Sequence, residues 1–182
     1  KRIKNNKFSK KNFKNKLILD VGCGSGRWSK LCYDLGAKKV IGLDSSRENI
    51  KFLQKKFPYI SFKYGDSISL PFKNNSFDIS ISWGVAHHTL DINKSLNELI
   101  RVTKKGGKIL LLLYGEGGLR WSLIKKLRPI VNFLGEKKVK SYMVESNFPE
   151  NRIKHFTDDL FVPIQSQIGL NTVKEIFKGK IT

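Results

Sequence analysis

The sequence is short of cysteine, of acidic residues and of long apolar runs, and each shortage excludes a class of protein. Two cysteines in 182 residues, Cys23 and Cys32, are too few for a disulfide scaffold and favour a reducing compartment, so we expect a cytoplasmic protein. The longest apolar run, Ile109 to Tyr114, is far shorter than the roughly 20 residues that cross a bilayer, which excludes a transmembrane segment. A share of 40% hydrophobic residues in turn excludes intrinsic disorder.

The shortage of acid leaves 35 Lys and Arg against 15 Asp and Glu, a formal charge of +20. A charge of this size favours nucleic acid or an anionic membrane as a partner. Lys, Asn, Ile and Phe are all abundant, however, as in chains encoded by AT-rich genomes, and apart from residues 1–16 the charge is spread along the chain. Nucleic acid is therefore an open alternative and not the favoured partner.

Strand and helix patterns alternate between residues 16 and 114. Short apolar or alternating runs predict five strands, over 17–21, 39–44, 60–64, 77–83 and 108–114. The last run is apolar on both faces, as in a central parallel strand. Helical spacing separates the strands, with a helix cap predicted at Ser45, another at Asp91 and a helix stop at Lys104 to Gly107. The alternation predicts an α/β fold, a doubly wound, mostly parallel sheet with helices on both faces.

We expect three parts along the chain. Residues 1–15 form a solvated basic arm, residues 16–182 form the folded domain, and residues 116–170 form an insertion or lid within it. The insertion begins with a basic amphipathic stretch over 119–134, which fits a lid over the cleft, a membrane-surface helix or ordinary packing. It continues as irregular sequence to a short helix over 171–178. No sixth strand follows, so we expect a chain truncated at its C-terminal end.

The residues that can carry chemistry fall after the predicted strands, and ligands of an open parallel sheet bind beyond the carboxyl ends of its strands. The turn Gly22-Cys23-Gly24-Ser25-Gly26 lets a ligand approach the backbone and the amides of the next helix, and Asp20 can accept a hydrogen bond from a cationic group. Asp44, at the end of the second strand, can accept both hydroxyls of a ribose. Together they predict a nucleoside-containing ligand. The G-x-G-x-G spacing disfavours a dinucleotide and hence a nicotinamide oxidoreductase.

Five motifs, in this order and spacing, resemble those of class I S-adenosylmethionine-dependent methyltransferases, most closely the small-molecule branch called type 11. They are Leu19 to Gly26, then Gly42-Leu43-Asp44, then Gly65-Asp66, then Phe77-Asp78 leading into Trp83 to Thr89, then Arg101 to Gly107. The resemblance covers about residues 16 to 114.

The resemblance implies a Rossmann-like methyltransferase fold that binds S-adenosyl-L-methionine and leaves S-adenosyl-L-homocysteine as product. It assigns residues in four places to the cofactor. Asp20, Gly22, Cys23, Gly24 and Gly26 would hold the methionine moiety, Asp44 the ribose, Asp66 with Ser67 the adenine edge, and Trp83 with Gly84 would border the sulfonium. Ser45 falls where the family often has an apolar residue against the adenine.

For the reaction, the resemblance implies in-line transfer of a methyl group to a small or medium-sized acceptor, which the protein aligns and shields from water. His88 or His87, just beyond the fourth strand, is the candidate base for an acceptor that must lose a proton. Because neighbouring side chains in an extended chain point apart, we expect only one of them to face the cleft. Adjacent histidines without a third spaced ligand predict no metal site. The alternatives are an RNA methyltransferase and a non-catalytic cofactor-binding protein of the same fold.

Overall fold

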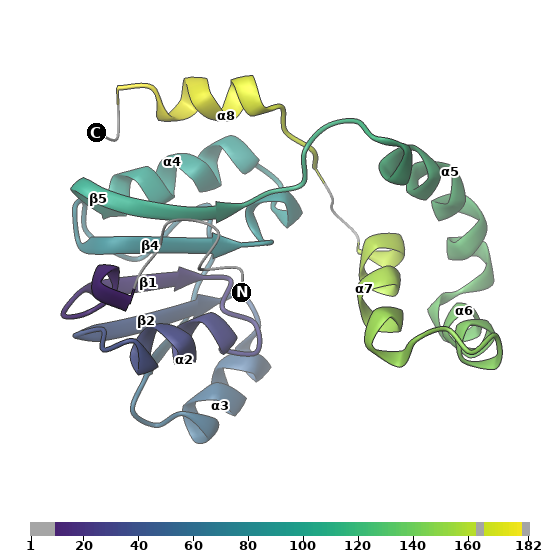
Figure 1. The fold of residues 1–182 in the computed structure, drawn as a ribbon, viewed down its shortest axis with the longest axis horizontal. Helices are drawn as coiled ribbons and strands as arrows, with labels where there is room; N and C mark the ends of the chain where they lie inside the picture. The colour runs from purple at the N-terminus through teal and green to yellow at the C-terminus, as the bar shows by residue number, and fades with distance from the viewer. Residues whose placement is uncertain (1–9, 163–165, 180–182) are drawn as a thin grey trace. The chain divides into compact units, whose positions relative to one another are not determined.

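The structure, a computed structural model, describes residues 10–162 and 166–179, and the chain divides into two compact units (Figure 1). The first unit comprises Lys1–Tyr114 with Ser166–Thr182, and the second comprises Gly115–Gln165. The second unit therefore ends before the predicted insertion over 116–170 does. The role of that segment as a lid stays a prediction.

The first unit is built on a parallel sheet. Its described strands are β1 (Leu17–Val21), β2 (Lys39–Asp44), β3 (Ser61–Tyr64), β4 (Phe77–Trp83) and β5 (Thr103–Leu112). Their order is β3-β2-β1-β4-β5, and every neighbouring pair is parallel. The chain runs from β1 outward to β3 and returns to the other side of β1 at β4, which puts the topological switch point between the carboxyl ends of β1 and β4. The first four predicted strands are confirmed, and the fifth is present with different bounds.

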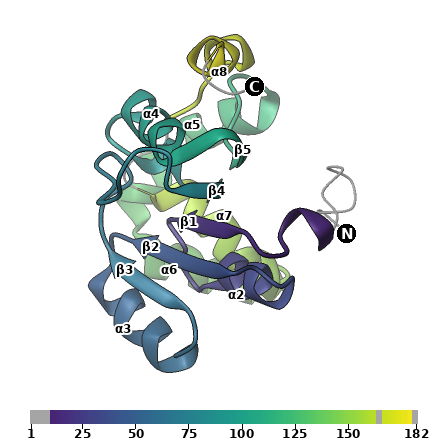
Figure 2. The ribbon, with the colours of Figure 1, turned by 90° about the vertical axis from the view of Figure 1, so that its left-hand side faces the viewer.

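Helices cover both faces of the sheet (Figure 2). On one face lie α2 (Arg27–Asp34) and α3 (Arg47–Lys56), whose buried residues Cys32, Ile50 and Leu53 share a core cluster with Ile18 and Ile79 of the strands. On the other face lie α4 (Ile92–Val102) and α8 (Leu170–Phe177), which pack against a second cluster. The members of that cluster include Leu19, Val21, Leu43, Leu96, Leu99 and Val102. The predicted doubly wound α/β fold is confirmed.

Strand β5 differs from its prediction in two ways. Helix α4 ends at Val102 and β5 starts at the next residue, instead of after a stop at Lys104 to Gly107. Pairing decides this, because Thr103 is in register with Phe77 and its hydroxyl oxygen lies 2.7 Å from that of Ser80 on β4. Among the described strands β5 is also an edge strand and not a central one. Its apolar run still packs on both faces of the sheet, since helices lie on each side.

The end of the predicted basic arm is part of the folded unit. Residues 1–9 lie outside the described residues, and Lys10–Asn12 form the 3₁₀ helix η1. Phe13 follows and is fully buried in the core cluster of α2 and α3. The expectation of a solvated arm is therefore wrong for its last residues, because one aromatic side chain enters the core and fixes the backbone beside it.

One of the two predicted helix caps is confirmed, and the other is displaced by one residue. Asp91 caps α4 as predicted, accepting a hydrogen bond from Lys94 N at 2.9 Å. The cap of α3 is Ser46 and not Ser45, since Ser46 Oγ accepts from Asn49 N at 3.1 Å while Ser45 is exposed. Strand β2 runs on to Asp44, so the chain needs one connecting residue before the helix can begin.

The second unit is helical throughout most of its length. It contains α5 (Leu119–Leu134), α6 (Glu136–Glu145) and α7 (Glu150–Phe161), so the expectation of irregular sequence after residue 134 is wrong. Pro149 stands just before α7, where a proline starts a helix instead of breaking it, and its carbonyl accepts from Arg152 N at 2.8 Å. None of the described helices is long and apolar enough to be a candidate membrane span.

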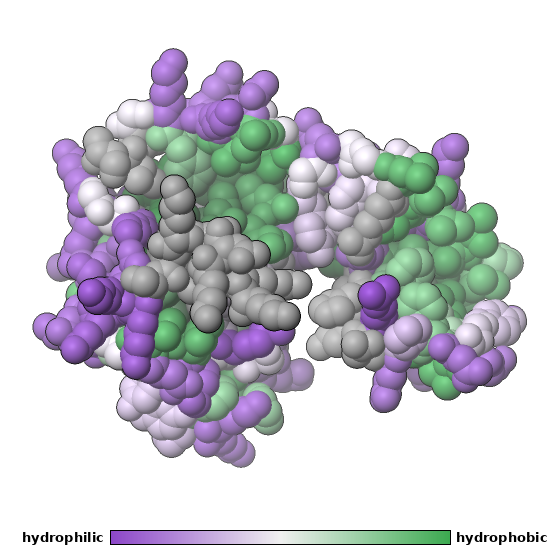
Figure 3. All heavy atoms as spheres, in the orientation of Figure 1, coloured by the Kyte–Doolittle hydropathy of each residue, from purple (hydrophilic) through white to green (hydrophobic). Residues whose placement is uncertain are grey.

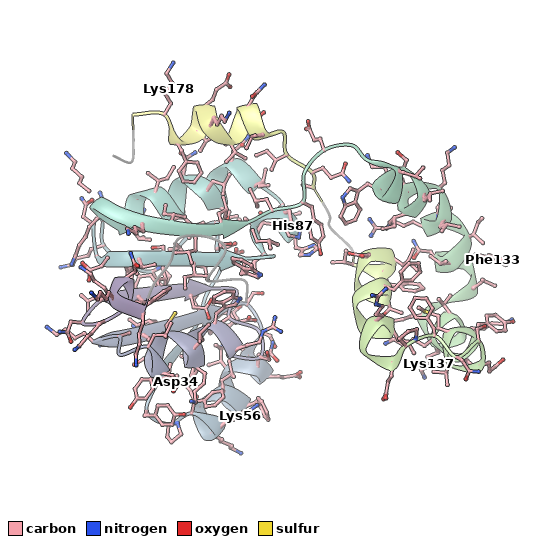
Figure 4. All side chains as sticks on the ribbon, viewed as in Figure 1. Asp34, Lys56, His87, Phe133, Lys137 and Lys178 are labelled. Carbon is pink, nitrogen blue, oxygen red and sulfur yellow. The ribbon has the colours of Figure 1, made fainter. Side chains whose placement is uncertain are left out.

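Helix α5 turns its apolar stripe largely to the surface. Ile124 is buried, and Arg128 Nε donates to the carbonyl of Leu160 on α7 at 3.1 Å. The large apolar side chains that are exposed on α5 are Leu119, Leu123, Leu127, Ile130 and Phe133, the last of them labelled in Figure 4. Figure 3 shows apolar residues over much of the visible face of this unit.

Arg101 joins helix α4 to the loop between β3 and β4. Its guanidinium forms a fork with Glu98, with Nε and Nη2 at 2.6 and 2.7 Å from the two carboxylate oxygens. The same group donates to the carbonyls of Leu70 and Phe72 at 2.9 and 2.7 Å. The fork with Arg101 lowers the pKa of Glu98, and the bonds to the two carbonyls hold the loop against α4. They give a physical reason for an arginine at the start of the fifth motif.

We expect Arg101→Lys to lower the free energy of unfolding by about 2 kcal/mol, because an ammonium group cannot replace the fork and the two loop carbonyls together. Arg27→Lys, at an exposed position of α2, is the matched control and should stay within about 0.5 kcal/mol of the parent. Urea denaturation followed by tryptophan fluorescence measures both. Equal midpoints for the two variants would mean that the fork adds nothing to stability.

Candidate functional site

The glycine turn after β1 is held by the end of β2. The amides of Gly22 and Cys23 both donate to the carbonyl of Leu43, at 2.7 and 3.0 Å, and the turn closes with a bond of 2.8 Å from Gly26 N to Cys23 O. Gly26 is the N-cap of α2 and offers no side chain, so the first amides of that helix have no side-chain cap. Uncapped amides at a helix start attract an anionic group.

Two glycines of the turn have different reasons to be glycine. Gly22 has φ +70°, and a Cβ there would lie 2.4 Å from Cγ1 of Val85, which belongs to the loop after β4. Gly24 has φ +50°, and a Cβ there would meet no atom within 4 Å. Packing therefore requires Gly22, whereas the space above Gly24 is open to a ligand. The contact between Gly22 and Val85 also brings the first and fourth motifs together.

Asp44 is buried at the end of β2 and touches the turn directly. Its Oδ2 accepts from Gly24 N at 2.8 Å and its Oδ1 accepts from Ser46 N at 2.9 Å. An ionised carboxylate has about four acceptor positions, so each oxygen can accept a further bond. The carboxylate both shapes the turn and keeps acceptor capacity beside it.

Asp20, at the carboxyl end of β1, is almost fully buried. Its Oδ2 accepts from Ser29 Oγ at 2.6 Å, which links β1 to α2. Burial raises the pKa of Asp20 to about 6, with the nearby Asp44 charge adding to the rise and the hydrogen bonds from Ser29 opposing it. An approaching cation would offset this penalty on the ionised form.

The residues after β3 lie beside those of β2. Gly65 N donates to the carbonyl of Asp44 at 3.1 Å, which sets Asp66 and Ser67 next to that strand end. Asp66 is exposed, and its Oδ1 accepts from Ile68 N at 3.0 Å to form a tight turn, while Ser67 is buried. Ser45 is exposed in the same region.

The end of β4 carries an aromatic pair. Trp83 and Trp28 are both half-buried, with ring centroids 4.5 Å apart and planes inclined by 41°. Gly84 follows with φ +77°, and its amide donates to the carbonyl of Leu112 on β5 at 3.1 Å. The pair offers apolar ring surface between β4 and the start of α2.

His87 and His88 lie in the 3₁₀ helix η2 (Ala86–His88), and Figure 4 labels His87 at the carboxyl end of the sheet. His87 is fully buried and stacks on Tyr114, with ring centroids 3.9 Å apart. Within the described residues neither ring nitrogen of His87 has a hydrogen-bond partner. Burial lowers the pKa of His87 to about 4, and the neighbouring His88 adds to the effect.

The two histidine rings do not point apart as expected for an extended chain, since their centroids are only 4.1 Å apart. His88 is half-buried, and its ring meets Tyr114 edge-on at 5.9 Å. The turn of η2 brings both rings to one side. Of the two, only His88 keeps exposed surface.

Sequence reasoning missed two residues of this edge, Trp28 and Tyr114. Tyr114 follows β5 and so reaches the same carboxyl edge as the histidines, a position that could have marked it. Trp28 carries no such signal, because only the fold brings its helix next to Trp83. Cys23 shows the opposite case, because its thiol is buried in the core and only its backbone faces the turn. Burial raises the pKa of the Cys23 thiol, so it stays protonated.

Residues 19–111 match a protein family described as "Methyltransferase domain". The chain is 40% identical over 95 residues to a demethylmenaquinone methyltransferase of Renibacterium salmoninarum, which covers 52% of this chain and 39% of that protein. It is 31% identical over 140 residues to a demethylmenaquinone methyltransferase of Desulfitobacterium hafniense, covering 69% of this chain and 55% of the relative.

Among solved structures, the YcgJ protein of Bacillus subtilis superposes with a TM-score of 0.59 at 25% identity, covering 91% of this chain and 61% of that chain. The chain thus spans between 39% and 61% of the length of these relatives. The resemblance stated from the five motifs is confirmed by these matches.

The buried His87 predicts a pH dependence of stability. Its folded-state pKa of about 4 lies below the ordinary 6.5, so its neutral form contributes stability that is complete above pH 6.5 and is lost as the pH falls toward 4. Between pH 7 and pH 5 we expect the parent to lose about 2 kcal/mol more of unfolding free energy than His87→Phe. His88→Phe is the matched control. Parallel pH profiles of the parent and His87→Phe would contradict this account.

Proposed function

Because the chain belongs to the class I S-adenosylmethionine-dependent methyltransferases of type 11, we propose that it binds S-adenosylmethionine at the carboxyl edge of its sheet and transfers the methyl group to a small acceptor. The observation that carries the proposal is the glycine turn, since Asp44 holds it in a left-handed conformation that leaves open space above Gly24. When bound, the cofactor supplies a methyl group already activated by its sulfonium.

The groups around the turn suit the parts of that cofactor. The uncapped amides at the start of α2 can receive its carboxylate, and the buried Asp20 gains from its ammonium group because a cation favours the ionised form. Asp44 has acceptor positions left for the ribose hydroxyls. Asp66 and Ser67 lie next along the edge for the adenine, and Trp83 with Gly84 lies on the other side of the turn for the sulfonium.

The acceptor side of the proposal rests on aromatic residues at the end of β4, after β5 and at the start of α2. Trp28, Trp83 and Tyr114 offer ring surface to an apolar or aromatic acceptor. Of the two candidate bases, we favour His88 over His87, because a group with a pKa near 4 is a weak proton acceptor at neutral pH. Since two relatives are named demethylmenaquinone methyltransferases, demethylmenaquinone is the first acceptor to test.

Titration calorimetry with S-adenosylhomocysteine, and with NAD as control ligand, tests the cofactor. We expect the chain to bind the former only. Asp44→Ala should weaken that binding roughly tenfold to a hundredfold, because two hydroxyls and the Gly24 amide lose a charged acceptor. Glu48→Ala, an exposed carboxylate on α3, should leave it unchanged.

Three results would count against the proposed cofactor site. Binding of NAD in preference to S-adenosylhomocysteine would indicate a different cofactor. No binding of either by a folded parent would contradict the site. Equal affinity in the parent and in folded Asp44→Ala would remove Asp44 from it.

Gly24→Ala separates ligand contact from backbone strain. Gly24 and Gly36 both have positive φ, and at neither would a Cβ meet an atom closer than 3.7 Å. Each alanine variant should therefore lose a similar free energy of unfolding, about 1 kcal/mol. Only Gly24→Ala should lose affinity for S-adenosylhomocysteine, by at least tenfold, because its methyl group enters the space reserved for the ligand. Equal affinities of the two variants would show that the ligand does not approach Gly24.

A further inference from the structure

A second concave site lies at the opposite end of the sheet, where the amino ends of β1, β4 and β5 meet. It has a volume of about 440 Å³. Its walls come from three segments far apart in the sequence, and they are lined by Lys11, Asn12, Lys16, Asp78, Ile79, Lys104, Lys105, Gly106, Gly107 and Lys108. We call it the lysine pocket. Figure 3 shows hydrophilic residues along the left edge of the first unit, where the strands begin.

The frame of the lysine pocket is fixed by Asp78. Its Oδ2 accepts from the amide of Leu17 at 2.7 Å and its Oδ1 accepts from Lys104 Nζ at 2.9 Å, so one carboxylate ties the starts of β1, β4 and β5 together. Gly107 is pressed against the same strand, since a Cβ there would lie 3.0 Å from the carbonyl oxygen of Asp78. The part of β5 that carries Lys105 and Lys108, where its pairing with β4 shifts register, is therefore held in place.

The lining has a large excess of positive charge. Of the charged residues that line it in the described part of the chain, five are lysines and one is an aspartate, and that aspartate already accepts hydrogen bonds from Leu17 and Lys104. The surroundings add to the excess, because 26 of the 35 basic residues but only nine of the 15 acidic residues belong to the first unit. Like charges that converge on one cavity repel each other, and a bound polyanion relieves that repulsion.

The lysine pocket is separate from the methyltransferase site. Lys16 precedes β1 and Gly22 follows it, so the two sites lie roughly 20 Å apart along that strand at about 3.3 Å per residue. None of the lining residues belongs to the glycine turn, to the acidic strand ends or to the histidine loop. Its chemistry is also different, since an excess of cations does not suit the positively charged groups of S-adenosylmethionine.

We propose that the lysine pocket binds a compact polyphosphate, either free triphosphate or the triphosphate chain of a nucleotide. Its volume lies in the range of pockets that hold small ligands, about 300 to 1,000 Å³. Among the described residues that line it, Ile79 is the only apolar one with a side chain and none is aromatic, so these residues offer no platform for stacking a base or for holding an acyl chain. A nucleic acid or a lipid would need such a surface, whereas a chain of phosphates needs only the ammonium groups.

Calorimetry with sodium tripolyphosphate, ATP and a short single-stranded RNA tests the proposal. We expect tripolyphosphate and ATP to bind with similar affinity, which falls as salt is raised. Lys16→Gln combined with Lys105→Gln should weaken both at least tenfold, since two ammonium groups are lost while the pair of Lys104 and Asp78 stays intact. Lys51→Gln combined with Lys55→Gln removes the same charge from the exposed face of α3 and is the matched control.

Each other outcome would overturn the proposal. Equal weakening by both double variants would mean attraction to the overall charge and no site. If tripolyphosphate does not bind the parent chain, the lysine pocket is not a polyphosphate site. RNA binding that depends on Lys16 and Lys105, with no binding of tripolyphosphate, would assign the pocket to a nucleic acid backbone. Titration of S-adenosylhomocysteine with the same variants shows that the other edge is intact, and its result is independent of the lysine pocket.

Discussion

The candidate site depends on one contact, the docking of the glycine turn onto the end of β2. The turn has no side chains of its own to fix its path, and the carbonyl of Leu43 and the carboxylate of Asp44 supply the acceptors for three of its amides. The bond from Gly24 N to the buried carboxylate of Asp44 is stronger than a bond to a neutral acceptor, because the acceptor is charged. The path of the turn in turn fixes where α2 begins, which amides it leaves uncapped and how Gly22 meets Val85. An acidic residue at this strand end thus has a structural task before any ligand arrives.

Local patterns were enough to predict the strands, the cap at Asp91 and the glycine and acid positions at the carboxyl edge. The errors arose where a distant contact decides. The cap of α3 is Ser46 and not Ser45 because one residue must connect β2 to the helix, and Thr103 joins β5 because it pairs with Phe77 of β4. The approach of Trp28 to Trp83, and of Tyr114 to the histidines, joins segments that no sequence spacing relates. The segment after residue 134 was predicted to be irregular, yet it forms helices α6 and α7, and Pro149 stands at the start of α7, where a proline begins a helix.

The two ends of the sheet carry charged residues of opposite sign, with carboxylates at the carboxyl edge and lysines at the amino edge. At the carboxyl edge, the glycine turn is flanked by Asp20, whose pKa is raised by burial, and by Asp44, which accepts a hydrogen bond from the turn. The aromatic rings of Trp28 and Trp83 lie close by. At the amino edge, lysines converge around a single aspartate that serves as a structural tie. A formal charge of +20 therefore does not describe the surroundings of the candidate cofactor site. The same three strands connect a region suited to a cation with one suited to a polyanion.

The strand order also governs how the sheet assembles as the chain is made. Leu17 of β1 is in register with Lys39 of β2, which lies close in the sequence, whereas its bond to Asp78 of β4 spans 61 positions. Closing the shorter loop costs less conformational entropy, and synthesis delivers it first. We therefore expect β1, the middle strand of the described sheet, to pair first with β2 alone and to be an edge strand until β4 has been synthesised. By then β2 can already hold the glycine turn, so half of the site is shaped before Trp83 and the histidines have been translated.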